Sequence, residues 1–178
     1  MSKCENKRVA LVLGSGGARG LAHIGAIEAL EERGYKITSV SGCSMGSIIA
    51  GMFCAGKLKE AKEWFLSVDR QRILQLTDFS ITGNSLVKGS KVIKALEDIV
   101  PECRIESLPV PLTLVASDLI TSDEVVFREG WLFEAIRASI SIRYSSSPCN
   151  GKDGYLSMAA YLIRCPSSIY SARRAIYS

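Results

Sequence analysis

Short apolar runs alternate with amphipathic segments along residues 1–142. Residues 9–13 (VALVL) and 36–40 (KITSV) are brief, partly β-branched runs, and small residues follow each of them. Such runs are typical of buried strands in a parallel sheet. Apolar positions at near-helical spacing come next, in 21–34 and in 47–55, and a glycine closes each segment. The pattern predicts two successive strand–turn–helix units.

The same alternation continues along the chain. We expect covering helices at 57–75 and 90–100 with a loop at 83–85 between them, strands at 112–116 and 124–128, and a helix at 132–139. Strands that alternate with helices predict a layered α/β fold with a mainly parallel sheet. Sites in such folds form at the carboxyl ends of the strands, and both glycine-rich turns of this chain fall there.

Length and composition indicate one globular domain. The chain has 178 residues, 47% hydrophobic and 22% charged, and no apolar run near the roughly 20 residues of a membrane-spanning helix. The polar start (MSKCENKR) does not resemble a signal peptide, so we expect a soluble, cytoplasmic protein. Six scattered cysteines without a C-x-x-C pair, beside one histidine, predict free thiols and no metal site.

Charge and composition change together near Ile142. Residues 1–142 carry 17 Lys+Arg and 17 Asp+Glu, whereas residues 143–178 carry five basic residues against the single Asp153. Five of the six tyrosines also lie in this tail. The net charge of +4 therefore gives no reason to expect nucleic acid as a partner. A neutral main part offers no electrostatic basis for stable membrane adhesion, so we expect at most transient contact through apolar surface.

Residues 42–46 (GCSMG) fit a nucleophile elbow. This strand-to-helix turn is so sharp that it needs small residues on both sides, and it leaves the oxygen of the central serine, Ser44, exposed. The start of a helix also places backbone N–H groups near the charge that develops during acyl transfer. A plain tight turn is the alternative for so short a pattern, but the flanking strand and helix favour a nucleophilic serine.

A second glycine-rich turn, residues 14–20 (GSGGARG), opens the first helix. Its amides point toward whatever anion lies above the sheet edge. A dinucleotide pyrophosphate would suit the glycine spacing, but the acidic residue that binds the ribose is missing at the end of the second strand. An oxyanion hole with the Gly16 and Gly17 amides as donors, and Arg19 as an anchor or a positive charge, explains both turns.

The single histidine, His23, stands a few residues into the first predicted helix. We expect it to have a packing or capping role, because a general base must reach the serine oxygen within hydrogen-bond distance. A Ser-Asp dyad, in which a carboxylate takes the serine proton directly, is therefore favoured.

The ordered set of motifs resembles the small bacterial patatin-like phospholipases. The similarity rests on residues 14–25 (GSGGARGLAHIG), 42–46 (GCSMG), 115–119 (VASDL) and 137–142 (RASISI). The resemblance implies a three-layer α/β/α fold, a Ser-Asp dyad, a glycine-rich oxyanion loop, no metal or other cofactor, and hydrolysis of the acyl esters of lipids.

By position, the resemblance assigns Ser44 as the nucleophile and places the oxyanion element on the loop with Gly14, Gly16, Gly17 and Arg19. The aspartate of the VASDL stretch is not the family's catalytic carboxylate, and we expect it to form a turn or a cap after its strand.

The resemblance stops after Ile142, so we divide the chain into an acyl-hydrolase part, 1–142, and an aberrant tail, 143–178. Patatin-like proteins continue with a proline and later an Asp-Gly-Gly or Asp-Gly-Ala that carries the dyad aspartate, and this chain lacks that motif. Our hypothesis is that loss of one base has shifted the reading frame of the tail. Codons 156–166 can be regrouped to spell Ile-Asp-Gly-Gly-Val-Phe-Asn-Pro-Leu-Pro, and Met158 before Ala159 forces one of these glycines. A natural divergent tail is the alternative.

One in-frame substitute for the missing base exists, Asp153 in KDG, although this tripeptide also suits a hairpin turn. Without a base the serine is a weak nucleophile.

Two functions are therefore considered: a serine acyl-ester hydrolase impaired by loss of the dyad aspartate, or a catalytically inactive lipid- or partner-binding protein on the same scaffold. Nucleotide binding through residues 14–20 is a third alternative.

Overall fold

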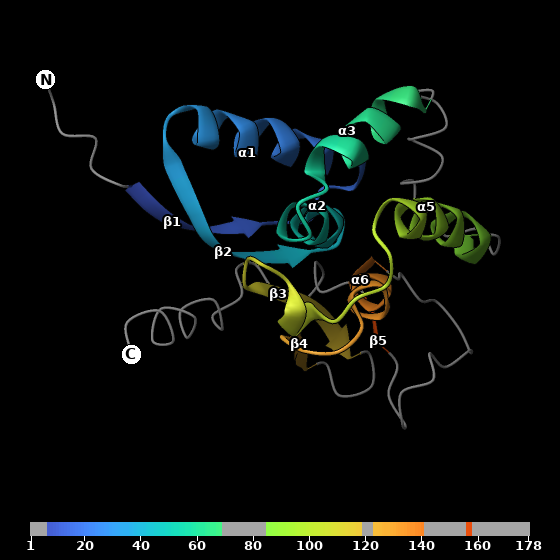
Figure 1. The fold of residues 1–178 in the computed structure, drawn as a ribbon. Coiled ribbons are helices and arrows are strands. Elements are labelled where there is room, and N and C mark those ends of the chain that lie inside the picture. Colours follow the sequence, from blue (N-terminus) through green and yellow to red (C-terminus); the bar gives the residue numbers. More distant parts are fainter. Residues whose placement is uncertain (1–6, 69–84, 119–122, 141–155, 158–178) are drawn as a thin grey trace, which may run out of the picture.

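The described part of the chain folds around one sheet. The computed structural model describes residues 7–68, 85–118, 123–140 and 156–157, without the side chains of 85–91 and 156–157. Strands β1 (Lys7–Leu13), β2 (Tyr35–Cys43) and β3 (Leu112–Asp118) run parallel, and β4 (Glu124–Phe127) pairs antiparallel with β3 (Figure 1). The strand order is β1-β2-β3-β4.

Helices follow and cover these strands. Helix α1 (Ala22–Glu32) follows β1 through a short 3-10 helix, η1 (Gly17–Leu21), and α2 (Met45–Cys54) follows β2 almost at once. The others are α3 (Leu58–Ser67), α5 (Ser85–Ile99), η2 (Ile105–Ser107) and α6 (Leu132–Ile140). The α/β fold with a mainly parallel sheet is confirmed. Among the described residues, no helix is both long enough and apolar enough to span a membrane.

The start of α5 differs from the sequence prediction. The helix begins at Ser85, five residues before the predicted start, so Ser85 is helical and not part of a loop. Gly89 and Ser90 lower the intrinsic helix propensity of this stretch, and that made the pattern look shorter than the helix is. The rest of the predicted loop, 83–84, and the end of the predicted helix 57–75 lie outside the described residues.

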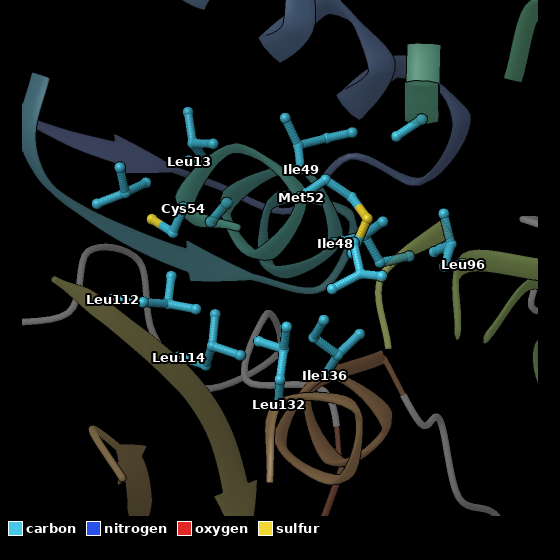
Figure 2. Packing of buried hydrophobic residues seen from close by; sticks show 14 of the residues in the cluster. Leu13, Ile48, Ile49, Met52, Cys54, Leu96, Leu112, Leu114, Leu132 and Ile136 are labelled. Atoms are coloured by element: carbon cyan, nitrogen blue, oxygen red, sulfur yellow. The ribbon is translucent and has the colours of Figure 1, made fainter. Parts of the chain in front are cut away.

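Helix α2 forms the centre of the core. Every residue of it except Phe53 is buried. The helix packs against β1, β2 and β3 and also against α6, whose Leu132 and Ile136 face it (Figure 2). Gly51 permits this close approach, because a Cβ atom there would lie 2.9 Å from Cδ1 of Ile136. The helix that starts after Ser44 is therefore fixed by packing on several sides.

The end of β3 carries the connection to β4. The backbone N–H of Asp118, the last residue of β3, donates to the carbonyl of Asp123 at 2.9 Å. Residues 119–122 lie outside the described residues, so the turn or cap role of this aspartate stays a prediction. A two-residue strand, β5 (Leu156–Ser157), pairs antiparallel with the end of β3. Asp153 and most of 143–178 lie outside the described residues, so the division at Ile142 stays a prediction.

Candidate active site

Ser44 occupies a strained turn between β2 and α2. Its φ and ψ angles are 56° and −122°, and within the described residues it is the one non-glycine residue with a positive φ. Such a conformation costs on the order of 1–3 kcal/mol, so the surrounding structure must hold it in place. Strain at one serine in a strand-to-helix turn is the geometry expected of a nucleophile elbow.

The two glycines that flank Ser44 are required by close backbone contacts. A Cβ atom at Gly42 would lie 2.5 Å from the carbonyl oxygen of Gly46. A Cβ atom at Gly46 would overlap the carbonyl oxygen of Leu13 and lie 2.6 Å from that of Gly14. The elbow is therefore packed directly against the end of β1, where the first glycine-rich turn begins.

The side chain of Ser44 is fully buried, with 0% of its surface exposed, whereas the sequence predicts an exposed oxygen. The motif alone could not reveal this, because burial depends on residues far away in the sequence, such as Ser139 of α6, which hydrogen-bonds to the Ser44 backbone. Its Oγ has no hydrogen-bond partner among the described residues, a state that it shares with Ser117. A buried hydroxyl without a partner costs about 1–3 kcal/mol, which suggests a role beyond packing.

Ser139 in α6 holds the backbone of Ser44. Its Oγ accepts a hydrogen bond from the Ser44 N–H at 2.9 Å and donates one to the carbonyl oxygen of Val115 at 2.7 Å. Ser139 is fully buried. The bridge connects the elbow to β3 through α6, and it uses the N–H of Ser44, which is then not free for an oxyanion. No sequence pattern assigns this contact to Ser139, because 95 residues separate it from Ser44.

Ser47 holds the carbonyl group of Ser44, on the other side of the residue. Both its backbone N–H and its Oγ–H donate to the carbonyl of Ser44, at 2.8 Å and 2.6 Å. Together with Ser139, this contact fixes the two peptide groups of Ser44. The positive φ is therefore supported by hydrogen bonds at both ends of the residue.

The glycine-rich loop 14–20 lies against the elbow. A Cβ atom at Gly20 would lie 2.5 Å from Cγ of Met45, the residue directly after Ser44. Within the loop Gly17 has a φ of 54°, and the Arg19 N–H donates to the Gly16 carbonyl at 3.1 Å. The structure thus brings the proposed oxyanion loop and the nucleophile position together.

His23 connects the loop to α1. Its Nε2 donates to the Gly14 carbonyl at 2.9 Å, because a carbonyl oxygen can only accept. The ring therefore holds the beginning of the loop, and its position fits the packing role that the sequence predicts.

The described cysteines are free thiols: Cys43, Cys54 and Cys103. Burial raises the pKa of Cys54 to about 12. Burial, and then the charge of Glu102, also raise the pKa of Cys103. Both groups stay protonated near neutral pH and are therefore weak nucleophiles. Within the described part of the chain, no three His, Cys, Asp or Glu side chains gather as metal ligands would.

Curated relatives share this part of the sequence. An uncharacterized NTE family protein from Mycobacterium bovis and one from Mycobacterium tuberculosis are each 50% identical over 138 residues, which is 78% of this chain and 38% of theirs. The neuropathy target esterase sws of Drosophila melanogaster is 30% identical over 168 residues, covering 90% of this chain and 12% of that protein. The chain thus spans well under half the length of these relatives.

The fold and a family model agree with these similarities. The crystal structure of VipD from Legionella pneumophila superposes with a TM-score of 0.52 at 19% identity, covering 89% of this chain and 46% of that one. This likeness concerns the fold alone. The model of the patatin-like phospholipase family matches residues 11–145, which include both glycine-rich turns and Ser139. The chain therefore belongs to the patatin-like phospholipase family.

Proposed function

We propose that this chain carries the catalytic serine of a lipid acyl-ester hydrolase, an esterase or phospholipase that acts in the cytoplasm. Where the dyad aspartate is present, it takes the Oγ proton as Ser44 attacks the acyl carbonyl carbon, and this proton then leaves with the alcohol. Water then releases the fatty acid from the serine. The observation that carries the proposal is the strained, buried Ser44, whose neighbours Met45 and Gly46 lie against the glycine-rich loop.

Two features of the elbow support a nucleophile over a plain turn. A structural turn would favour glycine at a φ of 56°, because a side chain there costs free energy. Burying a hydroxyl without a partner adds a second cost at the same residue. Ser44 bears both costs, and the amides of Gly16 and Gly17 belong to the loop packed beside it, where they are our proposed oxyanion donors.

We further propose that the dyad aspartate has been lost through a frameshift after Ile142. The match to the family model ends at residue 145, close to the change in charge and composition. Asp153 is the in-frame substitute within the tail. The rival, a natural divergent tail, draws support from the Drosophila esterase, because an alignment that covers 90% of this chain extends past residue 145.

The lack of a base favours a second function for the chain as it stands. No described residue hydrogen-bonds to the Ser44 Oγ, and the sequence contains no Asp-Gly-Gly. A protein that binds lipid or a partner on this scaffold without turning it over would have these features. Transient contact of its apolar surface with a membrane would then be its route to lipid.

Labelling with a fluorophosphonate probe tests these proposals, because strong labelling requires an activated serine. Four proteins are compared: the natural chain, a chain from a gene with one base restored at codon 143, and the Ser44→Ala variant of each. We expect the restored chain to be labelled at Ser44 at least about a hundredfold faster than the natural chain, and Ser44→Ala not at all.

Each outcome separates the alternatives. Labelling of the restored chain that survives Ser44→Ala contradicts the assignment of the nucleophile. Equal labelling of the natural and restored chains contradicts the frameshift, and loss of labelling in Asp153→Asn would then assign that residue as the base. A folded restored chain that never reacts supports the binding function.

A further inference from the structure

Strand β1 forms one border of the sheet. In the order β1-β2-β3-β4 it pairs with β2, and no other described strand pairs with its outer edge. The strand has seven residues and no proline, and it is regular, because the register shift beside it comes from an extra residue of β2, Thr38. An edge strand of this length presents a row of backbone N–H and C=O groups with which another strand can pair.

One face of β1 is open as well. Helices α1 and α2 lie on the same side of β1 and β2 (Figure 1), and the half-buried Val9 and Leu11 pack against the core. Side chains alternate between the two faces of a strand, and on the other face Arg8, Ala10 and Val12 are exposed. Val12 is 45% exposed, although parallel strands are normally covered on both faces. Strand β1 therefore offers a partner both an edge and an apolar side chain.

The charges of β1 stand at its start. Lys7 Nζ lies 5.0 Å from the ring centroid of Tyr35 on the neighbouring strand, so this cation already has a contact. Arg8 forms no ion pair with another described residue, and residues 9–13 carry no charge. Like charges directly opposite each other destabilise a strand pair. The basic start of β1 therefore restricts the partner strands and registers that fit this edge.

We propose that β1 pairs with β1 of a second copy of this chain, antiparallel and across a two-fold axis at Ala10. Identical strands that meet edge to edge across a two-fold axis run antiparallel. Because side chains alternate between the faces, the axis must pass through a residue and not between two residues. Ala10 is the middle residue of β1, so this register pairs all seven residues.

The side chains of β1 suit this pairing. Arg8 lies opposite Val12 of the second copy, where its aliphatic part covers the exposed apolar surface, and no charge faces a like charge. Pairing along a single strand buries less than the roughly 1,600 Å² of a standard protein interface, so we expect a reversible dimer. Strand β1 ends at Leu13, whose carbonyl lies against Gly46 of the elbow. The dimer would therefore stabilise the strand that supports the elbow, whether or not the serine is reactive.

Analytical ultracentrifugation of the full-length chain over about a hundredfold range of concentration tests the proposal. We expect a monomer–dimer equilibrium whose Kd rises about tenfold or more in Val12→Lys, because each new lysine faces Arg8 of the other copy. Val12→Glu places a carboxylate opposite the same arginine and should keep or tighten the dimer. Leu66→Lys is the matched control, because Leu66 is also an exposed apolar residue but lies on α3, and its Kd should stay within about twofold.

Hydrogen exchange followed by mass spectrometry locates the contact. Amides of residues 7–13 should exchange more slowly as the concentration of the natural chain rises, and this effect should be lost in Val12→Lys. A monomer at every concentration, an assembly larger than a dimer, or equal weakening by Val12→Lys and Leu66→Lys would overturn the proposal. Protection of 7–13 that does not depend on concentration would overturn it too, because a segment of the same chain would then cover the edge.

Discussion

The two glycine-rich turns follow neighbouring parallel strands, yet their glycines are needed for different reasons. In the elbow, the Cβ positions of Gly42 and Gly46 are already occupied by backbone atoms of the elbow and of β1. In the loop, the Cβ position of Gly14 has no atom within 4 Å. The elbow leaves no room for side chains at its two glycines, whereas the loop has free space at its first glycine.

This difference suggests that the two turns have different roles. The elbow fixes the nucleophile through close packing and through hydrogen bonds from Ser139 and Ser47. The loop touches the elbow at Gly20 and leaves room at Gly14, where a ligand can approach its backbone. Substitutions in the elbow should therefore act mainly on folding, and those in the loop mainly on reactivity.

The largest effect is expected for Gly46→Ala. The added methyl would overlap the Leu13 carbonyl, which belongs to β1 and cannot rotate away. We expect a loss of about 3–5 kcal/mol in the free energy of unfolding, or a protein that does not fold. Urea unfolding followed by circular dichroism measures it. An unfolding midpoint close to that of the natural chain would show that the elbow has room for the added methyl group.

Ser139→Ala should have an intermediate effect. The substitution leaves the Ser44 N–H and the Val115 carbonyl without their buried partner, so we expect a loss of about 1–3 kcal/mol. In the frame-restored chain, labelling of Ser44 should also slow by more than the unfolded fraction explains, because the nucleophile loses its positioning contact.

Ser139→Thr is the control for that prediction, since it keeps a hydroxyl at the same place. It should recover part of the labelling rate even if the extra methyl lowers the Tm. Equal rates for the alanine and threonine variants, corrected for folded protein, would limit Ser139 to a structural role.

Sequence patterns were sufficient for the fold but only partly for the site. The strands and helices around both turns follow from short apolar runs, helical spacing and glycine, which are local signals. The Ser139 bridge and the burial of Ser44 join elements far apart in the chain, and no local pattern encodes them.

The smallest change in stability is expected for Gly14→Ala, and it tests the comparison most directly. The site has room for the methyl group, and alanine restricts the unfolded chain, so the free energy of unfolding should stay the same or rise by about 0.4–1 kcal/mol. The methyl would occupy the space beside the loop, so labelling of the frame-restored chain should become slower. If Gly14→Ala makes the protein more stable but its labelling slower, the methyl group hinders the approach of the ligand and does not disturb the fold. A destabilised protein would instead show that Gly14 is as tightly constrained as the elbow glycines, and the distinction between the two turns would fail.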